Sequence, residues 1–150
     1  MNTKIEILNK KAKFSYDIQG LYEAGIQLNG TEIKSIRNND ANIKDSYCII
    51  IDNEVFVKNI HIAKYKLSMI DNYESKRDRK LLLNRSEINK IQKMIQEKGM
   101  SVIPTKLFIN KKGFAKLEIG IGKGKKLFDK RETIKKRESQ IEIERTKKGE

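Results

Sequence analysis

Two pairs of apolar runs, each pair joined by turn residues, constrain the fold of this chain more than any other feature. Residues 47–51 (YCIII) and 55–57 (VFV) flank Asp52 and Asn53, and residues 102–109 and 114–121 flank the segment NKKG at 110–113. Short β-branched runs on either side of Asn, Asp or Gly are typical of antiparallel hairpins, where Gly113 is free to take a positive φ. The sequence therefore predicts two β-hairpins.

The other periodic segments predict two further strands and two helices. Residues 14–28 alternate apolar and polar side chains on both sides of Gly20, which predicts two strands that meet there at a turn or bend. Thr31 is a candidate N-cap of a short helix. Ser86 opens the clearest helical pattern, and Gly99 is expected to end it in the left-handed conformation. The apolar face of this second helix holds Ile88, Ile91 and Ile95.

These elements together predict a mainly β protein with short helices. Short strands joined by hairpins, with one helix inserted, favour a small antiparallel β-barrel, for which an OB-like barrel is one plausible form. We expect residues 1–13 to be a basic N-terminal arm, 14–121 the barrel and 122–150 a basic tail, with a long polar loop at 63–80. The tail has too few apolar residues to offset its ordering entropy, so we expect it to be disordered until bound.

The charge of the chain indicates a polyanionic partner. Lys and Arg outnumber Asp and Glu by 33 to 20, for a formal net charge of +13. Such an excess suits nucleic acid or an anionic membrane surface, although the chain lacks the amphipathic helix with bulky aromatics that a membrane-surface protein uses. The absence of a long apolar stretch, of an apolar run at the N-terminus and of a second cysteine beside Cys48 is consistent with a cytoplasmic protein.

The residues that usually carry catalysis or bind metal are scarce. His61 and Cys48 are the only residues of their types and lack any metal-ligand spacing, so neither a metal site nor nucleophilic catalysis is expected. Residues 120–126 (GIGKGKK) contain no Ser or Thr and fail the phosphate-loop pattern, and they read as a flexible, cationic hinge after a strand. Asp17, Glu23 and Glu32 are taken as surface carboxylates. We therefore predict no enzymatic activity and no cofactor.

Four basic clusters are the positive signal for function. They occur at residues 10–13, at Lys34 with Arg37, at 76–80 and at 123–126. One such cluster is usually an ordinary solvated surface, but four of them with an excess of +13 favour contacts with phosphates. Four tyrosines are candidates for stacking on bases, and for two of them, Tyr16 and Tyr22, core packing is an equal alternative. The other two are Tyr65 and Tyr73.

Several longer segments occur in order along the chain: NKKA at 9–12, YEAGI at 22–26, GTEIKSIR at 30–37, ANIKDSY at 41–47, RKLLL at 79–83, GIGKGKK at 120–126 and DKRETIK at 129–135. Together they resemble the small protein B family, the SsrA-binding proteins. The resemblance implies an OB-fold barrel that binds the tRNA-like domain of transfer-messenger RNA. It also implies delivery to stalled ribosomes in trans-translation, with the tail in the decoding centre and the mRNA channel. A general RNA-binding OB-fold chaperone or ribosome accessory protein is the alternative.

The resemblance also identifies candidate site residues, of which three match positions implicated in RNA binding. Lys116 is suited to a phosphate contact. Glu23 is suited to accept hydrogen bonds from a base or to hold a neighbouring cation. Leu82 either packs on a base or fills the core. The other expected RNA-binding residues are Asn9, Lys11, Lys34, Arg37, Asn42, Lys44, Arg79 and Lys80, and the expected ribosome-contacting tail residues are Lys123, Lys125, Lys126, Asp129, Lys130 and Arg131.

Overall fold

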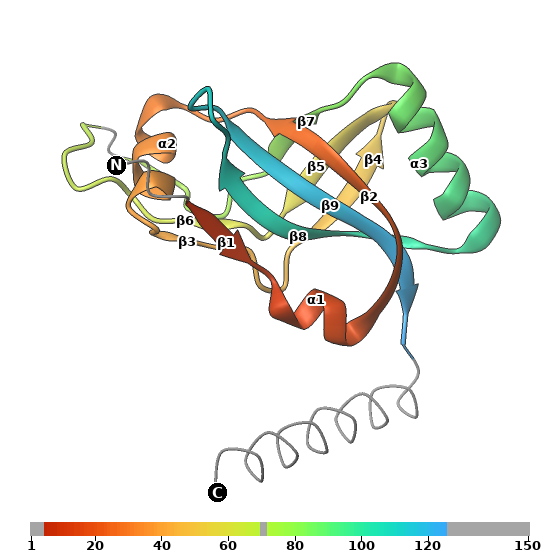
Figure 1. The fold of residues 1–150 in the computed structure, drawn as a ribbon. Helices are drawn as coiled ribbons and strands as arrows, with labels where there is room; N and C mark the ends of the chain where they lie inside the picture. The colour runs from red at the N-terminus through yellow and green to blue at the C-terminus, as the bar shows by residue number, and fades with distance from the viewer. Residues whose placement is uncertain (1–4, 70–71, 126–150) are drawn as a thin grey trace, which may run out of the picture.

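The computed structural model describes residues 5–69 and 72–125, which form a strongly bent antiparallel sheet and three helices (Figure 1). Seven strands follow the order β1-β8-β9-β2-β7-β5-β4, and a separate ladder joins β3 to β6. Because β4 also contacts β8, the sheet curls into a barrel, which confirms the predicted fold class. The elements are β1 (Glu6–Leu8), α1 (Lys10–Ser15), β2 (Tyr16–Ile26), α2 (Gly30–Arg37), β3 (Ala41–Asn42), β4 (Tyr47–Ile51), β5 (Glu54–Lys58), β6 (His61–Ile62), β7 (Arg79–Leu82), α3 (Arg85–Lys98), β8 (Ser101–Ile109) and β9 (Ala115–Gly124).

Both predicted hairpins are present. Between β4 and β5, Asp52 and Asn53 have positive φ angles of 51° and 62°, as a two-residue type I′ turn requires. Between β8 and β9, Gly113 has a φ of 86°, and the side chain of Asn110 accepts hydrogen bonds from two backbone amides of the turn. These turns confirm the two hairpins that the sequence pattern predicted.

The prediction of two strands that meet at Gly20 is wrong, because β2 is a single strand. Its pairing with β9 shifts between Ile18 and Gly20, which is the signature of a β-bulge. A bulge increases the local twist of a strand. A glycine within an alternating pattern is compatible with a turn and with a β-bulge, so the sequence pattern alone could not distinguish the two at Gly20.

Residues 120–124, expected as part of a flexible hinge, belong to β9 instead. The glycines here allow a close approach of backbones, since a Cβ on Gly122 would lie 2.1 Å from the carbonyl oxygen of Asp17. After the strand, the amide of Lys125 donates to the carbonyl of Ser15 at 2.8 Å. The strand therefore extends beyond the barrel boundary expected at residue 121.

The predicted helices begin earlier than expected, because asparagines cap them. Asn29 rather than Thr31 is the N-cap of α2, and Asn84 rather than Ser86 is the N-cap of α3. In both helices the carboxylate of a glutamate three residues after the asparagine accepts a hydrogen bond from the N-cap amide, which completes a capping box. Gly99 ends α3 at a φ of 62°, as predicted.

Part of the segment expected as an arm is folded onto the barrel. Strand β1 pairs with the edge of β8, Asn9 caps the unpredicted helix α1, and Ala12 of that helix is buried. The barrel therefore includes residues that the sequence pattern assigned to the arm.

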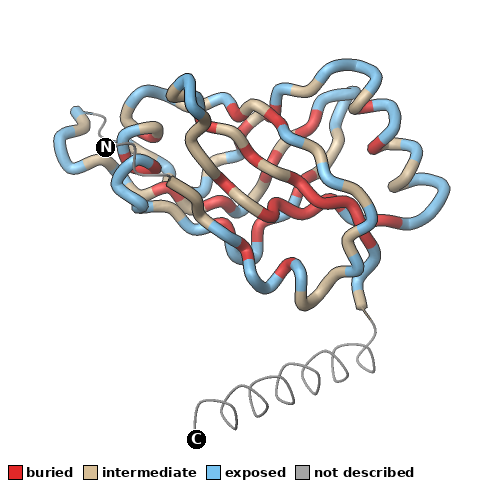
Figure 2. Tube along the Cα trace, viewed as in Figure 1, coloured by how far each residue is buried: buried red, intermediate tan, exposed pale blue. Residues whose placement is uncertain are grey.

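The hydrophobic core fills the inside of the curled sheet and is closed by α2 and α3 (Figure 2). Among the described residues, no helix has the length and apolar character needed to cross a membrane. Fully buried core side chains include Ile36, Ile43, Val55, Val57, Ile91, Leu107, Leu117, Ile119 and Ile121.

Candidate nucleic-acid interface

Glu23, Leu82 and Lys116 come from three neighbouring strands, β2, β7 and β9. Gly25 of β2 pairs with Leu82 on one side and with Lys116 on the other. Because side chains alternate across a strand, Glu23 shares the face of Gly25, and so do Leu21 and the two cross-strand partners. We call this surface, defined by Leu21, Glu23, Leu82, Phe108 and Lys116, the outer sheet face.

Apolar side chains on the outer sheet face are open to solvent. Leu82 is 51% exposed and Leu21 is 58% exposed, so Leu82 does not fill the core. A Cβ on Gly25 would lie 3.2 Å from the Cβ of Leu82, so the leucine lies close over the glycine backbone. The exposed leucines offer an apolar surface on which a base can pack. The charged groups beside them can form hydrogen bonds with the edge of that base.

The charged groups of this face are not used by the fold. Within the described part of the chain, Glu23 and Lys116 form neither a hydrogen bond nor an ion pair through their side chains. Glu23 lies opposite Glu118, whose carboxylate instead accepts from Thr105 at 2.9 Å. The alternative that Glu23 holds a neighbouring cation is therefore not supported, and its carboxylate is available to a partner.

Phe108 extends the outer sheet face toward β1. It pairs with Lys116, and the ammonium of Lys106 lies 4.8 Å from the centre of its ring. Sequence reasoning missed Phe108 and Lys106, although their place opposite Lys116 and Glu118 follows from the register of the second hairpin. The face thus combines aromatic, aliphatic and cationic groups, as sites for unpaired bases often do.

A second group of expected residues lies on and after α2. Lys34 and Arg37 are exposed, and the guanidinium of Arg37 donates to the carbonyl of Gly113 at 3.5 Å. Asn42 and Lys44 are also exposed, and the side chain of Asn42 accepts from the amide of Lys44. These side chains are accessible to a partner from the α2 end of the barrel.

Lys11 and Lys80 are accessible but already paired. The ammonium of Lys11 lies 2.8 Å from a carboxylate oxygen of Asp45, and this hydrogen bond raises the pKa of Lys11 and lowers that of Asp45. Lys80 lies 3.0 Å from a carboxylate oxygen of Glu54. Exposed pairs of this kind are weak, so both lysines can exchange a carboxylate for a phosphate at little cost.

Asn9 and Arg79 are the two expected RNA-binding residues that the structure places inside the protein. Asn9 is buried, donates to the carbonyls of Ile43 and Pro104 and accepts from the amide of Ala12. Arg79 is 0% exposed. Neither side chain can reach a nucleic acid in this conformation, and both instead hold segments of the barrel together.

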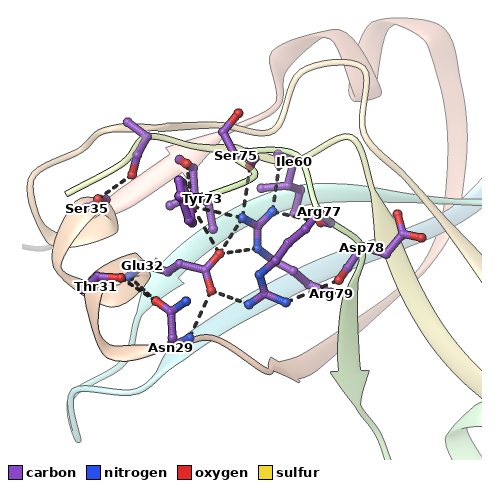
Figure 3. A network of polar contacts seen from close by, with 12 residues as sticks. Asn29, Thr31, Glu32, Ser35, Ile60, Tyr73, Ser75, Arg77, Asp78 and Arg79 are labelled. Atoms are coloured by element: carbon purple, nitrogen blue, oxygen red, sulfur yellow. Dashed lines mark hydrogen bonds and ion pairs between the residues drawn. The ribbon is translucent and has the colours of Figure 1, made fainter. Parts of the chain in front are cut away.

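The charge of Arg79 is balanced by Glu32, which is buried and not a surface carboxylate as expected (Figure 3). Nε and Nη2 of Arg79 donate to one Glu32 oxygen at 2.9 and 2.5 Å, and Arg77 donates to the other. Burial alone would raise the pKa of Glu32. Hydrogen bonds from Arg77, the amide of Asn29 and Arg79 outweigh it and hold the pKa below its usual value.

The remaining donors of Arg79 are satisfied by the chain that surrounds it. They reach the carbonyls of Ile60, Ser75 and Arg77 at 2.9, 3.1 and 3.3 Å. The hydroxyl of Tyr73 joins the same group and donates to the carbonyl of Ile62 at 2.7 Å. Tyr73 is therefore a structural residue of this cluster rather than a free stacking platform.

Of the expected tail residues, only Lys123 and Lys125 lie within the described part of the chain. Lys123 is exposed near the end of β9, and Lys125 is half-buried. Lys126, Asp129, Lys130 and Arg131 lie outside the described residues. Cys48 is buried in an apolar setting that raises its pKa far above the usual range. Across residues 5–69 and 72–125, no group of three or more His, Cys, Asp or Glu is arranged to hold a metal ion.

Comparisons with known proteins agree on one family. The family model for the SmpB protein matches residues 6–149. SsrA-binding proteins from Flavobacterium psychrophilum and Christiangramia forsetii are 51% and 48% identical, over 96% and 99% of this chain and 96% and 94% of their own lengths. A solved structure described as "tmRNA-SmpB: a journey to the center of the bacterial ribosome" superposes with a TM-score of 0.70 at 34% identity, covering 87% of this chain and 94% of that one.

Proposed function

The chain belongs to the SmpB protein family, and from that premise we propose that it binds transfer-messenger RNA and delivers it to stalled ribosomes in trans-translation. One observation of the structure carries the proposal most directly: Glu23, Leu82 and Lys116 share one face of the sheet, where Leu82 is exposed and the Glu23 carboxylate and Lys116 ammonium have no partner within the described barrel. Such groups are available for binding because no interaction within the described barrel competes for them.

The outer sheet face is suited to the irregular parts of a folded RNA. The Lys116 ammonium would contact a phosphate, and the Glu23 carboxylate would accept hydrogen bonds from base amino or imino groups. Leu21, Leu82 and Phe108 would pack against bases that leave the stack. Sequence-specific RNA recognition mostly uses unstacked bases in loops, so a tRNA-like domain is a fitting ligand.

The tail is proposed to act at the ribosome. Its lysines and arginines, from Lys123 to Arg131, would contact phosphates of rRNA in the decoding centre and the mRNA channel, while Asp129 accepts from a base or orients Arg131. Strand β9 directs the chain out of the barrel at Lys125, where the backbone is tethered to Ser15. The barrel thereby fixes the point from which the tail departs.

No chemical step is assigned to the protein itself. It would act by binding and positioning, in the cytoplasm where ribosomes translate, and without a cofactor.

Competition binding tests the proposal against that of a general RNA-binding protein. The full chain would be titrated into labelled transfer-messenger RNA, with either an unlabelled tRNA-like fragment or an unstructured RNA of equal length as competitor. The proposal predicts that the tRNA-like fragment competes at far lower concentration. Equal competition by both RNAs would overturn it in favour of a general RNA chaperone.

A further inference from the structure

Residues 64–69 (KYKLSM), which we call the loop tip, extend from the barrel beside α2 (Figure 1). Leu67 is 77% exposed and Met69 is 94% exposed, the highest values among the large apolar side chains described. Lys64 and Lys66 are exposed as well, and the loop tip contains no acidic residue. Two adjacent apolar groups with lysines around them indicate a contact surface for an anionic partner.

The base of the loop is held firmly to α2. The hydroxyl of Ser35 donates to the carbonyl of Ala63 at 2.7 Å, and the amide of Ala63 donates to the carbonyl of Asp40 at 2.9 Å. On the returning side, Tyr73 and Arg77 both bond to the buried carboxylate of Glu32 (Figure 3). Both ends of the loop are therefore fixed by one helix.

The loop tip has order of its own. The ammonium of Lys34 on α2 lies 5.3 Å from the centre of the Tyr65 ring, and the amide of Ser68 donates to the carbonyl of Tyr65 at 2.9 Å. A cation over an aromatic face is attractive. The turn directs Leu67 and Met69 outward, where neither is covered by the barrel.

We propose that the loop tip is a second RNA-contacting element, and that Glu32 is the positioning residue that holds it in place. Leu67 and Met69 would pack against unstacked bases or ribose of a folded RNA, while Lys64 and Lys66 contact its phosphates. RNA fits better than an apolar protein surface because every charged group of the tip is cationic. This inference rests on the proposed function and deepens it.

Titration of the full chain with transfer-messenger RNA tests the contact. The double variant Leu67→Ser with Met69→Ser removes the apolar area of the loop tip and is expected to bind roughly tenfold more weakly. The swapped variant, Leu67→Met with Met69→Leu, keeps the apolar area and should bind like the parent chain. Equal affinity of the serine variant would overturn the inference. If the parent chain itself fails to bind this RNA, it is the proposed function that fails.

A milder variant tests the positioning role without emptying the buried cluster. Tyr73→Phe removes the hydroxyl that joins Ile62 to Glu32 and Arg79, and it should weaken RNA binding a few-fold at temperatures where the protein is fully folded. In this background the serine substitutions at 67 and 69 should cost less than in the parent chain. Full additivity of the two effects would mean that the cluster only stabilises the fold, and the positioning role would be withdrawn.

Discussion

The outer sheet face and the buried cluster of Glu32, Tyr73, Arg77 and Arg79, here called the Glu32 cluster, both contain acidic and basic residues but use them in opposite ways. On the outer sheet face, the Glu23 carboxylate and the Lys116 ammonium are accessible and make no pair with the described residues. In the cluster, the Glu32 carboxylate is buried against two guanidinium groups, and Arg79 is completely enclosed. A charge is therefore available for binding where the fold leaves it unpaired, and it serves the fold where burial makes pairing obligatory.

The largest effect is expected when the buried carboxylate is removed. Glu32→Ala leaves Arg79 buried without a counter-charge, which should lower the free energy of unfolding by about 3–5 kcal/mol. Glu23→Ala is the matched control and should change it by no more than about 0.5 kcal/mol, as an exposed residue does. Urea unfolding measures both. Similar losses for the two variants would remove the distinction between the two regions.

Lowering the pH should reproduce part of the loss of stability that is expected for Glu32→Ala. The pKa of Glu32 is lowered from 4.5 in the folded protein, so its contribution to stability is fully present above that pH and is lost as the pH falls through the folded pKa. Stability measured between neutral pH and pH 2 should fall less steeply for Glu32→Gln than for the parent chain. Asp45→Asn removes a carboxylate whose pKa is also lowered, but by an exposed pair with Lys11, so it is the comparison variant and should change the slope less than Glu32→Gln does. A parent-like slope in Glu32→Gln would contradict the assignment.

A smaller effect, on binding alone, is expected at the outer sheet face. Glu23→Ala should weaken transfer-messenger RNA binding by about 1–3 kcal/mol, the range for a lost charged hydrogen bond, while Glu23→Gln retains part of the affinity. Thermal unfolding of both variants should match the parent chain. Early unfolding of both would instead make Glu23 a structural residue like Glu32.

The smallest effect is expected from a single phosphate contact. Lys116→Ala should reduce the slope of log affinity against log salt by about one, because one counterion fewer is released from the RNA. Lys90→Ala, which removes an exposed lysine of α3, should leave that slope unchanged. An identical change in both variants would indicate that only overall charge matters.

Local features of the fold could be predicted from the sequence, whereas long-range pairing could not. The pairs Asp52-Asn53 and Asn110 with Gly113 fix their hairpins through neighbouring residues alone. Asn29 was missed as an N-cap because Thr31 was an equally acceptable capping residue, although Glu32 three residues later was the stronger signal.

The roles of the charged residues depend on contacts between distant segments. Glu32 and Arg79 are 47 positions apart, and no local pattern links them. One signal was available, because Arg79 lies two positions before the buried Leu81 in β7. Side chains alternate along a strand, so Arg79 is expected to point inward with Leu81, whereas Lys80 and Leu82 point to the opposite face. The excess of basic residues instead favoured the interpretation that Arg79 is exposed and contacts RNA.

Mapping the RNA contact by amide chemical shifts tests the central claim most directly. The tRNA-like domain of transfer-messenger RNA would be added to isotope-labelled full-length protein. The largest shifts are predicted along the outer sheet face, at residues 21–25 of β2, around Leu82 and at residues 116–118. Shifts confined to α3 and the β4–β5 hairpin, with the outer sheet face unchanged, would contradict the account.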